Sequence, residues 1–499
     1  MREVMIYSTL DAKLVPLRPR VPPRISMFVC GITPYKPSHI GHGRTMVFFD
    51  TAARFLDYLG YRVFYLQNVT DIEDKILREA TEEGVEWNVI SERNFAGYLR
   101  EMQALGVDSV NFYARCTDYI PEIIAQIETL IAKGHAYESE GDVYYSVASF
   151  PAYGKLSGQR LEALEPGAHV EVNPKKRAPE DFALWKRERL GPRWPSPWGE
   201  GRPGWHIEDT AITVNVLGPS YDLHGGALEL KFPHHEAEIA QAEAATGKSP
   251  LAAIWMHAGL LNMRGEKMSK SLGNVLSLGD ALTMVRPEVL RFFFLSGHYR
   301  SPLDYAGPSS FEEANRAYET LEGSYHRLED ALAQRFPGTW TGPDGVARTF
   351  PGWKEWVAAV DATLPADPSK PGGDKVLESM ESSMANDFSV REATASLYTW
   401  AGEVNVILGN NPEKVPLEPL VRALRPFRFA QKVLGFFPAK GGGASEQALG
   451  KLVEIALEAR TRAKARKDFA EADRIRQELL AAGVLVEDTG GRARWRLKP

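Results

Sequence analysis

A strand-like run that leads into a histidine and glycine motif most constrains how this chain can fold. The run is Ile-Ser-Met-Phe-Val-Cys at residues 25–30, and the motif is Pro-Ser-His-Ile-Gly-His-Gly-Arg-Thr at residues 37–45. Apolar residues at helical spacing follow from Thr45 to Leu59, and a second strand-like run occupies residues 62–67. A strand, a helix and a strand at this spacing form a parallel pair, and such sheets bind ligands at the carboxyl ends of their strands. The pattern predicts an α/β fold with the histidine motif at the ligand-binding edge.

A second motif lies far downstream and completes the first. Residues 263–274 read Met-Arg-Gly-Glu-Lys-Met-Ser-Lys-Ser-Leu-Gly-Asn. Backbone N–H groups at the start of a helix favour anions, so His39 and His42 at that position can hold a triphosphate from one side. A glycine and serine loop that carries Lys267 and Lys270 can close over the other side. Each motif alone has a plain interpretation, a helix start with small residues or a solvated basic turn, but together they predict ATP-dependent activation of a carboxylate.

The ordered pair resembles the class I aminoacyl-tRNA synthetases, and other segments resemble one family among them, the cysteinyl-tRNA synthetases. Those segments are Phe-Val-Cys-Gly-Ile-Thr-Pro-Tyr at residues 28–35, Asn-Val-Thr-Asp-Ile-Glu-Asp-Lys-Ile at 68–76, Gly-Trp-His-Ile-Glu at 204–208, His-Gly-Gly-Ala-Leu-Glu-Leu-Lys-Phe-Pro-His-His-Glu-Ala-Glu at 224–238 and Asp-Phe-Ala-Glu-Ala-Asp at 468–473. The resemblance spans nearly the whole chain. It implies a Rossmann-type class I catalytic domain with an insertion, followed by an α-helical bundle and a small C-terminal domain.

The domain organisation follows from changes in the sequence pattern and from this resemblance. Residues from about 135 to 203 are rich in Pro, Gly and Trp, and we interpret them as an insertion between two halves of the nucleotide-binding fold. Pro- and Gly-rich stretches at residues 365–374 and 439–444 suit linkers. Segments whose pattern predicts helices, such as Val390 to Leu408, lie between them. The expected domains are the first half of the catalytic domain at residues 1–134, the insertion at 135–203, the second half at 204–305, the helical stem and bundle at 306–438, and a small tRNA-binding domain at 446–499.

The composition of the chain is that of an ordinary globular protein. Its 499 residues are 44% hydrophobic and 25% charged, which suffices for several domains with full cores. No uncharged apolar stretch approaches the roughly 20 residues that a membrane-spanning helix needs, so we expect a cytoplasmic protein without membrane contact. Cys30 and Cys116 are the two cysteines of the sequence, and they imply no disulfide framework.

The charge distribution bears on nucleic-acid binding. The formal net charge is −6, whereas residues 451–499 contain 12 Lys and Arg against 8 Asp and Glu. Contacts with phosphates need such basic residues, although a solvated helix face explains a charge run equally well. Arg494, Trp495 and Arg496 combine cationic and stacking groups suited to the unpaired bases of a tRNA anticodon. The alternative for this tripeptide is a hydrophobic plug flanked by solubilising charges.

A metal site follows from the resemblance. The family binds zinc with two cysteines, a histidine and a glutamate, and Cys30, His234 and Glu238 match three of these ligands, while Asp209 stands where the family has the second cysteine. In the family the substrate thiolate occupies an open metal position, and a thiolate bonds Zn²⁺ far better than the hydroxyl of serine does. A carboxylate binds zinc as a harder ligand, so zinc binding is an open question here. Three neighbouring positions also depart from the family, namely Ala227, Glu229 and Ala237.

The resemblance also assigns roles to residues around the reacting groups. We expect ATP, bound with Mg²⁺, to contact the histidine motif and the lysine loop, and Glu229 to accept hydrogen bonds from the ribose hydroxyls. The expected catalytic residues are His39, His42, Lys267 and Lys270, and the other expected ATP-binding residues are Gly41, Ser269 and Ser271. The expected substrate-binding residues are Thr33, Trp205, His206 and His224. Without the resemblance, Cys30 at a strand end suits a buried small hydrophobe, and His206 and His224 suit satisfied core histidines.

The function that the resemblance implies is activation of cysteine as cysteinyl-adenylate, followed by transfer to the 3′ end of tRNA(Cys). The expected partners are therefore tRNA(Cys), cysteine and ATP, with Zn²⁺ as a candidate metal, and we expect a monomer. Two alternatives are a ligase that joins an adenylated amino acid to a small amine and a catalytically idle tRNA-binding paralogue. The helical bundle and the basic C-terminal segment favour tRNA, and two intact motifs argue against an idle protein. Asp209 leaves open the activation of an amino acid other than cysteine.

Overall fold

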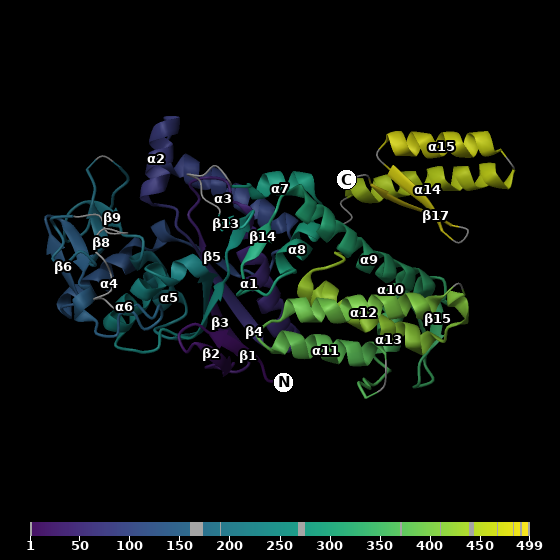
Figure 1. Cartoon of the computed structure of the whole chain (residues 1–499), viewed down its shortest axis with the longest axis horizontal. Coiled ribbons are helices and arrows are strands. Elements are labelled where there is room, and N and C mark those ends of the chain that lie inside the picture. The colour runs from purple at the N-terminus through teal and green to yellow at the C-terminus, as the bar shows by residue number, and fades with distance from the viewer. Residues whose placement is uncertain are drawn as a thin grey trace. The chain divides into compact units, whose positions relative to one another are not determined.

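A computed structural model gives the fold of the chain (Figure 1). It describes residues 2–497 apart from 160–172, 190, 268–274, 370–371, 410, 439–443, 467, 483 and 490–491. The chain divides into two compact units, Met1–Phe436 and Phe437–Pro499. The finer domain boundaries expected from the sequence stay predictions. Within the described residues, every helix is too short or too polar to span a lipid bilayer.

A five-stranded parallel sheet forms the centre of the first unit. Its strands follow the order β11–β10–β3–β4–β5, with bounds β3 Arg24–Ile32, β4 Arg62–Val69, β5 Phe112–Arg115, β10 Tyr221–Ala227 and β11 Ala252–Ala258. Both strands predicted from the sequence are present, and each is longer than predicted. In the register of β3 and β10, Val29 pairs with Gly225, so the carboxyl ends of these two strands meet at one edge of the sheet.

Helix α1, Ile40–Tyr58, connects β3 to β4 and begins within the histidine motif. Most of its side chains are buried, because the helix lies between the sheet and α8, Pro287–Leu295. Gly43 permits this close approach, since a β-carbon there would lie 2.8 Å from the ring of Phe294. The first turn of α1 is thereby held at the carboxyl edge of the sheet.

The segment predicted as an insertion contains a four-stranded antiparallel sheet. Its order is β6–β7–β8–β9, with bounds Ala136–Ser139, Asp142–Tyr145, Phe182–Arg187 and Gly201–Pro203. Three helices pack against this sheet around the buried Trp185, namely α4 Ile120–Ala132, α5 Ile207–Val216 and α6 His234–Thr246 (Figure 1). Ile212 of α5 and Ile239 of α6 also contact the core of the central sheet. These two helices therefore join the two sheets, and their first turns lie beside Cys30 of β3.

Shorter elements complete the catalytic part of the first unit. A small sheet of order β13–β12–β14 follows β11, with bounds β12 Leu261–Met263, β13 Glu266–Lys267 and β14 Leu303–Tyr305. The remaining elements are β1 Met5–Ser8, β2 Lys13–Pro16, α2 Asp74–Glu83, α3 Trp87–Ala104 and α7 Leu278–Met284.

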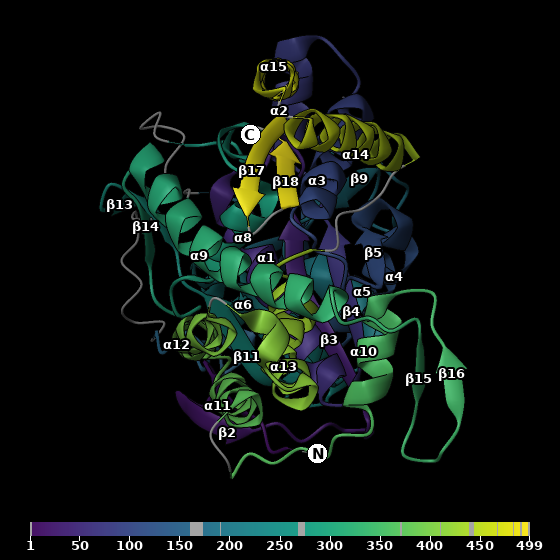
Figure 2. The same cartoon turned by 90° about the vertical axis from the view of Figure 1, so that its right-hand side faces the viewer.

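Antiparallel helices form the rest of the first unit. They are α9 Pro308–Ala333, α10 Trp353–Asp361, α11 Gly373–Ala385, α12 Val390–Leu408 and α13 Leu417–Phe429, with a hairpin of β15 Thr339–Thr341 and β16 Ala347–Thr349 between α9 and α10. Figure 2 shows α9, α11, α12 and α13 packed side by side. The helix predicted from Val390 to Leu408 is confirmed with those bounds. Trp400 at its centre is buried and donates a hydrogen bond to the carbonyl of Ala423 at 3.0 Å.

The second unit contains two helices and a hairpin. Their bounds are α14 Ala444–Ala465, α15 Phe469–Ala481, β17 Val484–Thr489 and β18 Arg492–Leu497. Val453 and Leu457 of α14 form a core with Val484 and Val486 of β17, and Trp495 packs against it.

Candidate active site

A cavity of about 230 Å³ opens at the carboxyl ends of the parallel strands. Its walls come from β3, β4 and β10, from the first turn of α1, and from the starts of α5 and α6. Eight residues singled out from the sequence line it, namely Cys30, Thr33, His39, His42, Trp205, Asp209, Glu229 and His234. The fold therefore collects in one cavity residues that are spread over two hundred positions of the chain.

The histidine motif forms one end of the cavity. His39 has an extended backbone with φ −116°, and its N–H donates to Nδ1 of His42 at 3.2 Å. The two imidazole rings stack with centroids 3.8 Å apart. Gly41 lies in the first turn, and that turn contains no acidic residue. The positive end of the helix dipole and two ring nitrogens thus favour an anion at this end of the cavity.

The lysine loop is anchored on the histidine motif. Strand β13 ends at Lys267, and the predicted contacts of Ser269, Lys270, Ser271 and the Lys267 side chain lie outside the described residues. Beyond the loop, the N–H of Ile40 donates to the carbonyl of Leu276 at 3.2 Å, and the N–H of Leu278 donates to the carbonyl of Ser38 at 2.8 Å. The segment just downstream of the loop is therefore hydrogen-bonded to the backbone of the histidine motif. The predicted ATP site requires the loop and the motif to lie close together in this way.

Arg44 connects the same motif to the upstream base of the loop. Its buried guanidinium donates to the carbonyls of Gly259 at 2.8 Å and His298 at 3.3 Å, and also to those of Leu260 and Ser301. These carbonyls immediately precede β12 and β14. Burial lowers the pKa of Arg44 to about 10, so it stays charged at neutral pH. The sequence pattern does not predict this role of Arg44, because its acceptors are distant backbone carbonyls that no motif encodes.

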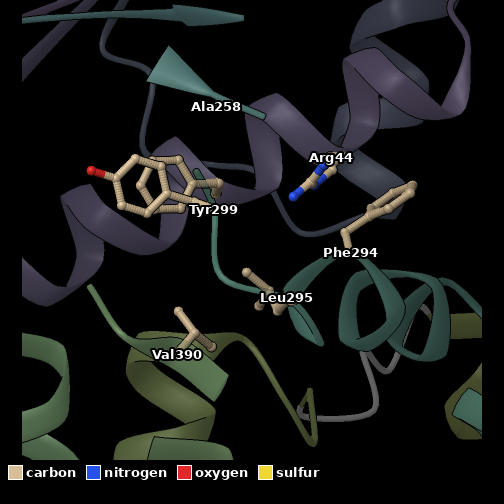
Figure 3. A pocket seen from close by; sticks show the side chains of 8 residues that line it. Arg44, Ala258, Phe294, Leu295, Tyr299 and Val390 are labelled. Carbon is tan, nitrogen blue, oxygen red and sulfur yellow. The ribbon is translucent and has the colours of Figure 1, made fainter. Parts of the chain in front are cut away.

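The space beside Arg44 is a packing defect. Figure 3 shows Arg44 and Phe294 on one side of it and Leu295, Tyr299 and Val390 on the other. It holds about 10 Å³, which is about the space of a single water molecule. A substrate cannot bind there.

Four side chains converge at the other end of the main cavity, and we name this group the open seat: Cys30, Asp209, His234 and Glu238. Nε2 of His234 lies 2.9 Å from Oδ2 of Asp209 and 3.0 Å from Oε1 of Glu238. Sγ of Cys30 lies 3.4 Å from Oδ2 of Asp209. Zinc bonds of about 2.3 Å to sulfur and about 2.0 Å to nitrogen or oxygen place tetrahedral donors about 3.3 to 3.5 Å apart. The four donors fit a zinc ion to within a few tenths of an ångström.

The electrostatics of this group also suit a cation. Burial, followed by the charges of Glu238 and Asp209, raises the pKa of the Cys30 thiol. Burial and then the charge of Asp209 raise the pKa of Glu238. The Cys30 thiol and the Glu238 carboxyl, this close together, ionise together only when a positive ion compensates them.

Asn68 orients Asp209 and was not predicted. Oδ1 of Asn68 accepts a hydrogen bond from the N–H of Gly31 at 2.7 Å, which fixes the amide so that Nδ2 donates to Oδ1 of Asp209. The other oxygen of Asp209 then faces Cys30 and His234. A β-carbon at Gly31 would lie 2.0 Å from the carbonyl oxygen of Asn68, so this glycine is required for the two strands to meet here.

Sequence comparison decides the family. The profile of the tRNA synthetases class I (C) catalytic domain matches residues 16–315, and that of the cysteinyl-tRNA ligase anticodon binding domain matches residues 447–496. The chain is 40% identical to the cysteine–tRNA ligase of Pelotomaculum thermopropionicum, over 98% of this chain and 99% of that one. It is 41% identical to that of Heliobacterium modesticaldum, with the same two shares covered. The chain belongs to the cysteinyl-tRNA synthetase family.

Solved structures confirm the predicted Rossmann-type fold of class I synthetases. Mycobacterium tuberculosis methionyl-tRNA synthetase, in complex with methionyl-adenylate, superposes with a TM-score of 0.58 at 16% identity, covering 83% of this chain and 92% of that one. Thermus thermophilus arginyl-tRNA synthetase gives 0.51 at 14% identity, covering 86% and 84%.

Within this member of the cysteinyl-tRNA synthetase family, two predicted substrate residues lie behind the cavity wall rather than on it. His206 places its Nδ1 2.8 Å from Nδ1 of His234, and His224 stacks on Trp255 with centroids 3.9 Å apart. Trp205 does line the cavity and stacks on His234 at 4.3 Å. Burial lowers the pKa of His206 and of His224, so both rings stay neutral.

The predicted tRNA contacts lie in the second unit. Trp495 of β18 pairs with Val486 of β17 and packs against the small core, which agrees with the hydrophobic plug considered for it. The side chains of Arg494 and Arg496 lie outside the described residues. Contact of this tripeptide with tRNA stays a prediction.

Proposed function

We propose that this protein activates cysteine with ATP as cysteinyl-adenylate and then transfers the cysteinyl group to the 3′ end of tRNA(Cys). One observation carries the proposal: a single cavity has the anion-favouring histidine motif at one end and the open seat, a cysteine, histidine and carboxylate cluster, at the other. Family membership over nearly the whole length supports it, because these two relatives are named cysteine–tRNA ligase and match 98% of this chain.

The first step is in-line attack of the cysteine carboxylate on the α-phosphorus of ATP, which releases pyrophosphate. Alignment of the reactants and neutralisation of the developing phosphate charge supply the acceleration. His39 and His42 contact the phosphates, and Gly41 lets the nucleoside approach the backbone of α1. Lys267 and Lys270, with Ser269 and Ser271, stabilise the departing pyrophosphate, and Mg²⁺ accompanies ATP. Glu229 in the cavity wall accepts the ribose hydroxyls.

The open seat provides the specificity for cysteine. A zinc ion held by Cys30, Asp209, His234 and Glu238 would supply a soft site for a thiolate. Asp209 and His234 line the cavity and present this site to the substrate, while Trp205 and Thr33 form the adjoining walls. Serine offers a hydroxyl that cannot form an equivalent bond, so selection needs no separate editing reaction.

Residues 446–499 provide the tRNA contacts in this proposal, with Arg494, Trp495 and Arg496 against anticodon bases. Neither the ligase for a small amine nor the idle paralogue is supported, since the relatives named cysteine–tRNA ligase match the anticodon binding domain as well as the catalytic one. A cytoplasmic monomer stays a prediction.

Pyrophosphate exchange with each of the common amino acids tests the function, with zinc content measured on the same sample. We expect exchange that depends on cysteine, and we expect His42→Asn to lower it about 100-fold without lowering the zinc content, because the histidine contacts only the phosphate end. Exchange with serine alone would refute the selection of cysteine. Absence of exchange with every amino acid would favour an idle binder.

A further inference from the structure

A second group of potential metal ligands lies directly behind the open seat. We name it the closed seat: Cys30, His224, His235 and Glu238. Sγ of Cys30 lies 3.1 Å from Nε2 of His235 and 3.8 Å from Nε2 of His224. Nε2 of His224 lies 3.4 Å from Oε2 of Glu238. These distances bracket the tetrahedral spacings of about 3.3 to 3.5 Å, so the closed seat fits zinc as well as the open seat does.

The two seats share two ligands, so a single zinc ion occupies one seat or the other. Cys30 belongs to both, and the carboxylate of Glu238 turns Oε1 toward His234 of the open seat and Oε2 toward His224 of the closed seat. Filling both seats at once would need the Cys30 thiolate and the Glu238 carboxylate each to bridge two zinc ions. In addition to the shared ligands, a single ion binds either Asp209 and His234 or His224 and His235.

Hydrogen bonds at Nδ1, the ring nitrogen that faces away from Cys30, orient both histidines of the closed seat. Nδ1 of His235 lies 2.8 Å from Nε2 of His257, whose Nδ1 lies 2.8 Å from Oγ1 of Thr9. Nδ1 of His224 lies 2.7 Å from the hydroxyl of Tyr221. Histidines that bind metals use one ring nitrogen and have the other oriented by such a partner. Both Nε2 atoms are thus aimed at the space between Cys30 and Glu238.

The donor atoms and the access of the two seats differ. The closed seat offers one sulfur, two imidazole nitrogens and one oxygen, whereas Asp209 gives the open seat one sulfur, one nitrogen and two oxygens. Zinc in a site with thiolate prefers the softer imidazole to a second carboxylate, and the oxygen of Asp209 is the donor that replaces the family's cysteine. His224 and His235 are fully buried and absent from the cavity wall, so the closed seat admits no substrate.

We propose that in the resting protein zinc occupies the closed seat, which consists of Cys30, His224, His235 and Glu238. Zinc prefers this seat because Asp209 gives the open seat a second carboxylate in place of a softer ligand. Substrate cysteine shifts the zinc ion to the open seat, because the substrate thiolate reaches only that seat and gives it a second sulfur ligand. The substrate thiol releases its proton to water in the cavity, the bonds from His224 and His235 break, and those from Asp209, His234 and the substrate sulfur form. Only this response to cysteine rests on the proposed function.

X-ray absorption at the zinc edge tests the resting state, with zinc-loaded full-length protein and without ATP, tRNA or cysteine. We expect one sulfur and two imidazoles around the ion. One sulfur and one imidazole would place the ion in the open seat and overturn the proposal. Asp209→Cys is the matched variant: by giving the open seat a second thiolate it should move the ion, so that the spectrum shows two sulfurs and one imidazole.

Zinc affinity provides an independent test, since His235→Gln and Asp209→Asn each remove a donor from one seat alone. We expect the dissociation constant to rise about 100-fold for His235→Gln and less than about threefold for Asp209→Asn. The reverse ranking, or equal losses, contradicts the proposal. Cys116→Ser, at a buried cysteine outside both seats, controls for general damage to the core. If His235→Gln fails to fold, His257→Gln removes the partner of His235 and should weaken binding about tenfold.

Addition of cysteine to the zinc-loaded protein separates this proposal from the proposed function. A gain of one sulfur and loss of one imidazole supports both. An unchanged spectrum with two imidazoles leaves the closed seat established and contradicts the role of the open seat in binding cysteine.

Discussion

Asp209 stands where the resemblance to the family implies a cysteine, and its effect depends on a neighbour in space. Asn68 and Asp209 are 141 positions apart, yet the amide of one holds one oxygen of the other. That hydrogen bond leaves a single oxygen of Asp209 for the seat, so the carboxylate replaces a one-atom thiolate donor without presenting both oxygens. The substitution and the orienting amide act together.

We expect Asn68→Ala to raise the KM for cysteine in pyrophosphate exchange about tenfold and to leave the KM for ATP unchanged. Without the amide, Asp209 loses the partner that directs its second oxygen, an outer contact whose loss costs about 10- to 100-fold in comparable sites. The same change in the Asp209→Cys background should have little effect, because a thiolate needs no such orientation. Equal effects in both backgrounds would show that Asn68 acts on the strand rather than on Asp209.

At the scale of elements, the proposed ATP site depends on how one helix and one hairpin are joined. Backbone hydrogen bonds tie Leu276 and Leu278 to the start of α1, and Arg44 ties the same helix to the carbonyls before β12 and β14. The lysine loop therefore has both of its ends fixed relative to the histidine motif. Such positioning matters because displacement of a reacting group by about 1 Å can cost about 100-fold in rate.

Arg44→Met should reduce kcat for pyrophosphate exchange by about 100-fold, with a smaller loss for Arg44→Lys, which restores the charge and part of the hydrogen bonding. The change leaves buried carbonyls without donors, and it should lower the free energy of unfolding by about 2 kcal/mol. Calorimetry separates the two effects. If stability falls while kcat persists, Arg44 has a structural role alone.

At the scale of the whole molecule, the candidate active site and the segment that matches an anticodon binding domain lie in different units. The cavity, both seats and the histidine motif lie within Met1–Phe436, and the second unit has its own core around Val453 and Val484. Adenylation needs only ATP and the amino acid. The first unit is thus sufficient, in principle, for the first step of the proposed reaction.

Removal of residues 446–499 should leave pyrophosphate exchange within about threefold of the full-length value, because no residue of the cavity is lost. Charging of tRNA should fall by about 100-fold or more, since the proposed anticodon contacts and a net basic segment disappear with the deletion. Both reactions are measured on the same preparation. Equal loss of both would mean that the second unit supports the fold of the first.

Local patterns in the sequence determined the fold class, the family and eight residues of the cavity wall. The helix from Val390 to Leu408 and the strand before the histidine motif were predictable because short-range apolar spacing specifies them. Cys30, Asp209, His234 and Glu238 were found through motifs whose order along the chain is characteristic of the family, and the structure brings them together.

Tertiary structure alone decided which residues support those motifs. Arg44 contacts carbonyls more than 200 positions away, Asn68 of β4 meets Asp209 of α5, and His235 faces Cys30 from a different element. No local pattern encodes such pairs. They form because the ends of the strands and the starts of the helices meet at one edge of the parallel sheet. The sequence therefore determined which chemistry the chain can perform, and the packing of the sheet and helices decided which side chains hold that chemistry in place.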